Sequence, residues 1–204
     1  MKLDRLLLST VLGAVVLAPS SVRAGHEDPS TVLDAYVQLR DEGCDVSQLG
    51  SPIAVRALRN VPYAQQGKIF KSEELTYLYA HDGGWYAPSD ADADVGSADD
   101  RACVRKLDAQ EQKLRRRVKL KKPIEQAVTR HPGAVLDMTR LVLADFKKFR
   151  QSERTRGGMR VWTLEFEAGG AAALVTVECK LPDADAKAKP PAWSKLECNV
   201  LAAG

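Results

Sequence analysis

The spacing of apolar residues changes along the chain from three or four positions to two. Up to about Arg130 the apolar residues recur at helical spacing, and after Val135 they alternate with polar residues. Alternation is typical of an antiparallel sheet that has one solvated face. The pattern therefore predicts an α+β protein, in which a helical N-terminal part is followed by a small antiparallel β-sheet packed on a helix.

Three helices are predicted in the first part. The first runs from about Ser30 to Gly43, and the second begins after Ser51 with a proline at its first helical position. The third is capped by Ser72 and ended by Gly83-Gly84.

A proline is expected to interrupt the second helix. Pro62 lacks the amide donor that a helix interior requires, so the helix should break there. The residues that follow, Tyr63–Gln66, are then expected to form a short helical turn that Gly67 closes.

The charge changes sign in the middle of the chain. Residues 81–100 carry six aspartates and no lysine or arginine, which predicts an exposed loop. Residues 103–122 carry nine basic residues and predict a helix, with Val104, Leu107, Leu114 and Val118 partly marking an apolar face, which Pro123 ends or redirects. One more helix over 124–130 is expected to end at His131-Pro132-Gly133.

Four strands are predicted in the last part, and the first is the least regular. Trp162, Leu164 and Phe166 should point to one side of the sheet, and Thr163 and Glu165 to the other. Gly157-Gly158 and Gly169-Gly170 provide turns, and 182–191 reads as a polar loop. The predicted strands are Val135–Phe149, Met159–Ala168, Ala171–Leu181 and Ala192–Leu201.

The first residues have the order of a secretory signal peptide. Lys2 and Arg5 precede the apolar run 6–18, and Val22-Arg23-Ala24 is a small-x-small cleavage site before Gly25. The predicted organisation is a signal peptide over 1–24, a helical module over 25–103, a basic linker helix over 104–123 and a sheet domain over 124–204. Removal of the leader lowers the formal net charge from +3 to +1, which does not favour nucleic acid as a partner.

The chain has four cysteines, all of them after the leader. An even number of cysteines in an exported chain predicts disulfides. Of three possible pairings, Cys44–Cys103 with Cys179–Cys198 is favoured because each bond then closes one predicted unit. A cysteine metal site is not favoured, since closely spaced pairs such as C-x-x-C are absent from the sequence.

Residues 51–88 carry a specific pattern, which consists of Leu58-Arg59-Asn60, Tyr63-Ala64, Gly67, Phe70, Ser72, Glu74-Leu75, Tyr79, Trp85-Tyr86 and Pro88. This pattern resembles the YARHG domain, a small helical module of bacterial exported proteins, over about 40 of the 204 residues. The resemblance implies a compartment and a fold more than an activity. Gln65 and Gln66 stand where the family has arginine and histidine, so any role of those charges does not carry over.

Residues with catalytic or metal-binding chemistry are few. Asp90, Asp92 and Asp94 could converge on calcium, but the spacing lacks the glycine and glutamate of an EF-hand loop, which favours a solvated acidic loop. His81 adjoins Asp82 and lies near Ser89, although proximity in sequence is poor evidence for a catalytic triad. His131 is interpreted as a turn residue. The sequence therefore predicts no catalytic residues, no cofactor and no metal.

Two features could form a ligand surface. The basic run 113–122 could hold an anionic polymer, or it could be a solvated face beside the acidic loop. The aromatic residues could stack on a ligand, or they could fill the core of the module. The residues considered for such a surface are Tyr63, Trp85, Tyr86, Arg115, Arg116 and Arg117.

These observations predict an exported, periplasmic or extracellular protein that is not an enzyme and does not span the membrane once the leader is removed. Its expected role is to bind or organise a cell-envelope component through the YARHG-like module, with an envelope polymer or another exported protein as partner. The alternative is an enzyme or enzyme inhibitor that acts through the sheet domain.

Overall fold

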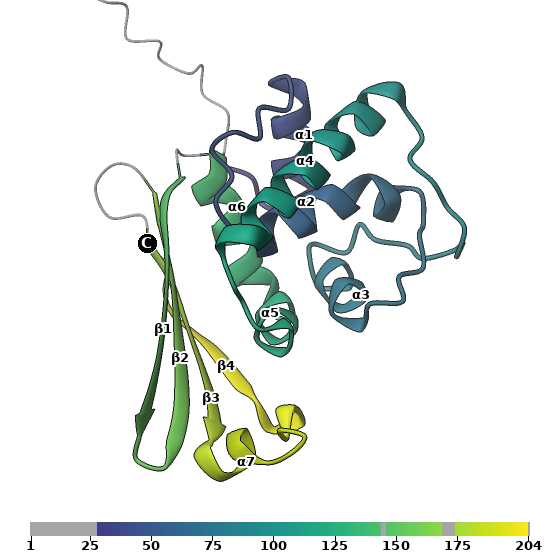
Figure 1. The fold of residues 1–204 in the computed structure, drawn as a ribbon. Helices are drawn as coiled ribbons and strands as arrows, with labels where there is room; N and C mark the ends of the chain where they lie inside the picture. The colour runs from purple at the N-terminus through teal and green to yellow at the C-terminus, as the bar shows by residue number, and fades with distance from the viewer. Residues whose placement is uncertain (1–27, 144–145, 169–173, 204) are drawn as a thin grey trace, which may run out of the picture.

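The computed structural model of the protein describes residues 28–143, 146–168 and 174–203. Helices form the first part of the chain and strands the last part (Figure 1). The helices are α1 (Val32–Asp41), α2 (Pro52–Gln65), α3 (Glu73–Ala80), α4 (Ala98–Arg117), α5 (Lys122–Thr129), α6 (Pro132–Leu143), α7 (Asp183–Lys187) and the 3-10 turn η1 (Trp193–Lys195). The strands are β1 (Phe146–Arg156), β2 (Met159–Ala168), β3 (Leu174–Pro182) and β4 (Glu197–Ala203). The predicted signal peptide and the predicted turn at Gly169-Gly170 lie outside the described residues.

The strands form one antiparallel sheet in the order β1-β2-β3-β4, as the alternating pattern predicts. Trp162 and Leu164 are buried on β2, opposite Cys179 and Val177 of β3. Helix α6 contacts all four strands and α5 contacts β4, so the predicted helical cover over one face of the sheet is confirmed. The other predicted turn, Gly157-Gly158, joins β1 to β2 with both glycines at positive φ.

The first predicted strand is wrong over most of its length. Residues 132–143 form α6, and β1 begins only at Phe146. Val135 and Met138 are buried on one face of this helix. Pro132 therefore begins a helix instead of ending one, because the first helical position needs no amide donor. Two further boundaries differ: β4 begins at Glu197, after η1, and the predicted polar loop contains α7.

The predicted starts of the first three helices are confirmed. The hydroxyl of Thr31 caps α1 by accepting a hydrogen bond from the amide of Asp34, whose carboxylate accepts one in return. Ser51 caps α2 in the same way through the amide of Ala54. Helix α3 follows Ser72 as predicted, but the Ser72 side chain makes no capping hydrogen bond, and the helix ends at Ala80 instead of at Gly83-Gly84.

Pro62 does not interrupt the second helix, which continues to Gln65. The expected separate turn over Tyr63–Gln66 is thus the last turn of α2. Val61, Pro62 and Ala64 are all buried. Their burial offsets the hydrogen bond that the proline cannot donate, which is a case of tertiary packing overriding local propensity.

The basic helix begins earlier and ends earlier than expected. Ser97 caps α4, so Asp99 and Asp100 lie in its first turn, where carboxylates complement the positive end of the helix dipole. Leu107 and Leu114 are buried as predicted. The helix ends at Arg117, and Pro123 lies in the first turn of α5 instead of ending α4.

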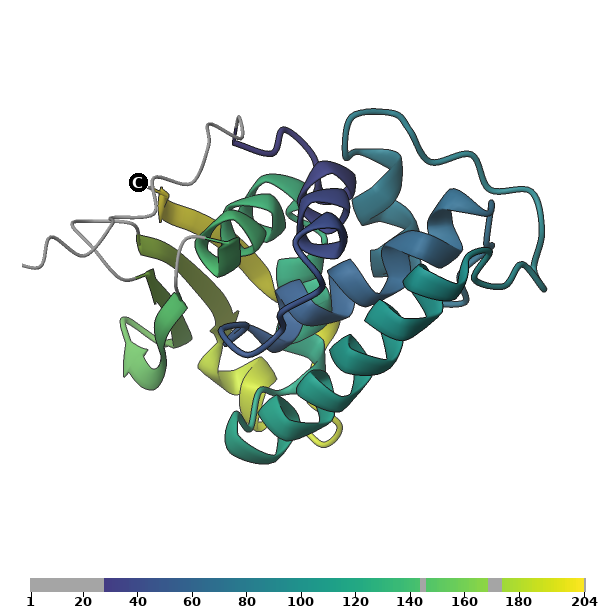
Figure 2. The same ribbon diagram turned by 90° about the horizontal axis from the view of Figure 1, so that it is seen from above.

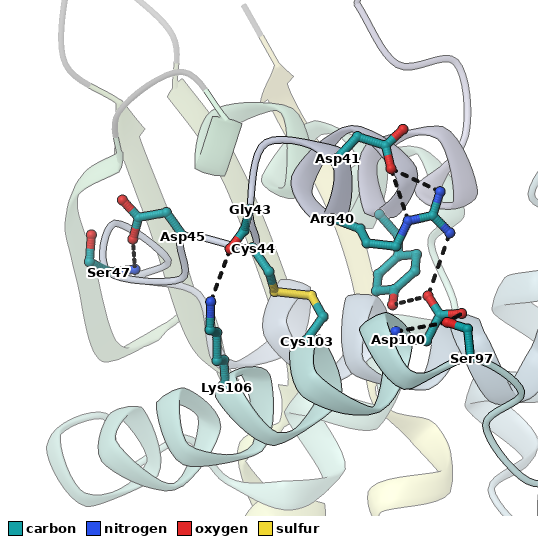
Figure 3. The surroundings of a disulfide bond; sticks show 11 residues. Arg40, Asp41, Gly43, Cys44, Asp45, Ser47, Ser97, Asp100, Cys103 and Lys106 are labelled. Atoms are coloured by element: carbon teal, nitrogen blue, oxygen red, sulfur yellow. Dashed lines mark hydrogen bonds and ion pairs between the residues drawn. A yellow bond between two sulfur atoms is a disulfide. The ribbon is translucent and has the colours of Figure 1, made fainter.

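Both favoured disulfides are present. Cys44–Cys103 ties the end of α1 to α4, and Cys179–Cys198 joins directly opposed positions of β3 and β4. Figure 3 shows that the first bond is flanked by Lys106, whose ammonium donates to the carbonyl of Gly43 at 2.9 Å. On its other side Arg40 contacts Asp100 at 3.5 Å.

One hydrophobic core runs through the helical part and the sheet. Seen from above, α6 lies between the strands and α1 (Figure 2), and it contacts α1 and α2 as well as the sheet. The segments predicted as a helical module and a sheet domain therefore share their interior.

Candidate binding site

The aromatic residues of the YARHG-like segment pack on one another. Tyr79 is fully buried, and its ring centroid lies 5.4 Å from that of Trp85 and 5.8 Å from that of Tyr86. The hydroxyl of Tyr79 donates to the carbonyl of Ala57 and that of Tyr86 to the carbonyl of Lys68, at 2.7 and 2.6 Å. Tyr86 is only 8% exposed and Trp85 is half-buried, so these two rings belong to the core of the segment.

Two residues of the possible Ser/His/Asp triad, Asp82 and His81, have structural partners. The buried carboxylate of Asp82 accepts hydrogen bonds from the amide of Val32 and the indole of Trp85, at 2.9 Å each. Burial raises the pKa of Asp82 above its usual value, although these hydrogen bonds lower it. His81 stacks on Tyr77, with Nδ1 2.8 Å from that residue's carbonyl oxygen. Asp82 therefore holds α1 and the aromatic cluster in place, and the described contacts do not assemble a nucleophile with a base.

The other candidate chemical groups have local roles. Asp90 accepts a hydrogen bond from the amide of Asp92, and Asp94 accepts one from the amide of Val95. His131 lies in the turn between α5 and α6, where its amide donates to the carbonyl of Val128. Within residues 28–143, 146–168 and 174–203, no three His, Cys, Asp or Glu side chains are grouped so that they could hold a metal ion.

The three consecutive arginines of α4 have different environments. Arg115 binds Glu111 and Glu125, which are almost fully buried. Hydrogen bonds, first to Glu125 and then to Glu111, raise the pKa of Arg115 above its usual value. Arg116 and Arg117 are exposed and have no ion-pair partner among the described residues. Arg115 is therefore held by two buried carboxylates although its own side chain is 41% exposed, a contact that the sequence interpretation did not anticipate.

Arg115 belongs to a network of ion pairs that we call the arginine network. Arg56 contacts Glu74 at 3.0 Å and Glu125 at 3.7 Å. Arg59 contacts Asp108 at 2.7 Å. It also lies 3.0 Å from Oε2 of Glu111, which accepts no aligned hydrogen bond. The members are Arg56 and Arg59 of α2, Glu74 of α3, Asp108, Glu111 and Arg115 of α4, and Glu125 of α5. The polar face of α2 thus packs on three other helices.

A basic groove of about 750 Å³ opens between the helices and the sheet. One wall is the end of α4 and the link to α5, and another is the edge strand β1, with the loop between α1 and α2 beside them. Among the described residues that line it, three are cations: Lys113, Arg117 and Lys119. All three are exposed, and none has a hydrogen-bond or ion-pair partner among the residues that the structure describes.

Lys121 joins the two walls of the basic groove. Its ammonium lies 3.2 Å from Oε2 of Glu153 on β1 and 4.8 Å from the ring centroid of Trp162. Glu153 also binds Arg160 at 2.8 Å. Burial raises the pKa of Glu153, but these cationic hydrogen-bond donors outweigh burial and lower the pKa overall. Among the groove-lining residues that the structure describes, Glu153 is the only carboxylate, and its charge is already compensated by Lys121 and Arg160, whereas the three cations have no ion-pair partner.

A second groove, of about 550 Å³, lies between α2 and α4. Tyr63 is half-buried in its wall, next to Asn60, Phe70 and Arg105. Of the six residues considered for a ligand surface, Tyr63 and Arg117 line grooves, and these grooves are separate.

The sequence interpretation missed part of the basic groove. Lys113 and Arg117 are four residues apart and therefore share a helix face, which was a usable indication. The contribution of β1 had no such indication, because it depends on where the sheet, which packs on α6, lies relative to α4.

Comparison of the chain with models of known protein families finds no match, and comparison with curated proteins and with solved structures finds none either. Among the described residues, no helix is both long enough and apolar enough to cross a membrane.

Proposed function

We propose that this chain is an exported, non-enzymatic binding protein of the bacterial cell envelope, built on a YARHG-like helical module, and that it holds an anionic partner in the basic groove. The observation that carries the proposal is the convergence of Lys113, Arg117 and Lys119 on one groove, where none of the three has an ion-pair partner among the described residues. Exposed lysine and arginine side chains that meet in a concave site attract anions well beyond what the net charge of the chain indicates.

Two disulfides support the exported location, because such bonds persist in oxidising compartments. The non-enzymatic role is supported by the titratable groups. The groups with shifted pKa values form structural contacts, such as Asp82 with the start of α1 and Arg115 with Glu125.

The test is co-sedimentation of the mature protein with isolated bacterial cell envelopes at low and high salt. Wild type should sediment at low salt and be released near 1 M salt, where the Debye length falls to about 3 Å. A variant with Lys113→Gln, Arg117→Gln and Lys119→Gln should remain in the supernatant.

A matched control removes the same charge elsewhere, through Lys71→Gln, Arg116→Gln and Lys122→Gln. These residues are exposed and do not line the basic groove. Equal loss of envelope binding in both triple variants would show that binding depends on the net charge of the protein and not on the groove. Binding that survives in the groove variant would overturn the proposal.

A further inference from the structure

The basic groove has a free strand edge along one wall. Strand β1 pairs with β2 on one side only and forms an end of the sheet. Its other edge makes no backbone hydrogen bond with the residues that the structure describes. Unpaired amide and carbonyl groups in a row are a template on which another extended chain can pair.

This edge is regular enough to accept a strand. The only irregularity in its pairing with β2 lies between Phe146 and Lys148, and from Phe149 to Arg156 the register is continuous. Proline, which blocks many edge strands, is absent from this stretch. Phe149, Gln151, Ser152 and Glu153 line the groove, so the free edge and the three cations face the same space.

The charges on both walls decide which strand can pair there. Arg150, Arg154 and Arg156 are exposed on β1 itself, where Arg150 pairs with Glu167 and Arg154 with Glu178. Lys113 and Arg117 stand on the facing helix and have no ion-pair partner among the described residues. A second copy of β1 would bring like charges together, which disfavours pairing between two copies of this protein. An acidic strand would instead direct every second side chain toward the cations, because side chains alternate along a strand.

We propose that the partner in the basic groove is an acidic polypeptide segment in extended conformation, which adds to β1 as a fifth strand. This inference rests on the function proposed above. It narrows the partner to a protein segment: main-chain hydrogen bonds to β1 hold it, and Lys113, Arg117 and Lys119 select its charge.

The test uses a blocked peptide of about nine residues, a usual strand length, in which glutamate alternates with threonine. Two further peptides keep this sequence but carry N-methyl groups, one at every glutamate and the other at every threonine. Each methylated set removes the amide donors along one edge of the peptide only. Affinity is measured by titration calorimetry, and protection of the β1 amides by hydrogen exchange.

Strand addition predicts an asymmetric result. One methylated peptide should bind about tenfold or more weakly than the parent, since it loses several main-chain hydrogen bonds, while the other keeps its affinity. Amides between Phe149 and Arg156 should become protected when the parent peptide binds. A peptide with lysine in place of glutamate should not bind.

Equal affinity for the parent and both methylated peptides, with no new protection of the β1 amides, would overturn the inference. The groove would then bind the peptide through its charge alone, without main-chain hydrogen bonds to β1. Envelope binding that depends on the three cations, with no binding of the acidic peptide, would also overturn it in favour of a non-peptide polyanion, and the proposed function would stand. Envelope binding that does not change when Lys113, Arg117 and Lys119 are replaced would overturn the proposed function as well.

Discussion

Arg115 and Glu125 face each other in a two-point hydrogen bond, with Nη1 2.9 Å from Oε2 and Nη2 2.6 Å from Oε1. This pair joins the last turn of α4 to the first turn of α5. The link between these helices carries Lys119, which faces the basic groove together with Arg117. The arginine network therefore fixes the geometry of the wall that presents the cations.

Replacement of Arg115 by alanine should destabilise the protein strongly. It leaves Glu111 and Glu125 buried without their shared cation, and breaking a buried pair costs about 3–5 kcal/mol. The arginine side chain is 41% exposed, so solvent screening reduces the expected loss to about 2 kcal/mol. Urea denaturation measures this loss. Arg116→Ala serves as the control and should change the free energy of unfolding by less than about 0.5 kcal/mol. Equal effects of the two variants would contradict the network.

The stabilising contribution of the ionised Glu74 carboxylate should be lost in acid. Burial raises its pKa, but hydrogen bonds from its own amide, Ser72 and Arg56 outweigh burial, so the pKa lies below the usual 4.5. The unfolded chain then binds the proton more readily, and the contribution of Glu74 is complete above pH 4.5 and is lost as the pH falls through the folded-state pKa.

The check is the free energy of unfolding of Glu74→Gln and wild type from neutral pH into the acid range. The variant should be less stable near neutrality, and the difference should shrink below about pH 4.5. A difference that stays constant with pH would show that the carboxylate is not the source.

The two disulfides should differ in their contributions. They close chain segments with sequence separations of 59 and 19. Chain-entropy arguments give about 4 kcal/mol for the longer loop and about 3 kcal/mol for the shorter one. Unfolding of the Cys44→Ser/Cys103→Ser and Cys179→Ser/Cys198→Ser variants measures both values. A larger loss for the second pair would mean that packing around the sheet, and not loop closure, sets the order.

Tyr86→Phe separates a core role from a surface role. The substitution removes the hydroxyl that donates to the Lys68 carbonyl and should cost about 1 kcal/mol of stability, read from urea denaturation. Because the ring is buried, envelope co-sedimentation should not change. Lost binding with unchanged stability would place the ligand on this aromatic residue instead.

The sequence predicted those features of the fold that local pattern determines. The alternation of Trp162 and Leu164 predicted the sheet face, and Ser51 marked the start of α2. Prolines were the main source of error. Pro62 lies inside a helix and Pro132 begins one, because packing and position within the helix decide what a proline does, and neither can be seen locally.

The site was predicted less well than the fold, for a related reason. Arg115, Arg116 and Arg117 look equivalent in the sequence, yet only the first meets buried carboxylates, from α4 and α5. The sequence did not decide whether Tyr86 is buried or exposed, because its burial depends on packing against Tyr79 and on the hydrogen bond to the Lys68 carbonyl. Charge and aromatic content identify candidates, whereas partners from distant elements decide which of them face a ligand.

The most direct measurement compares Arg117→Gln with Arg116→Gln in a salt-dependent envelope-binding titration. The two residues are adjacent on α4, equally charged and both exposed, but only Arg117 lines the basic groove. A binding site in this groove predicts that Arg117→Gln weakens binding and lowers its salt dependence, while Arg116→Gln matches wild type. Equal weakening by the two variants, or none by either, would contradict it.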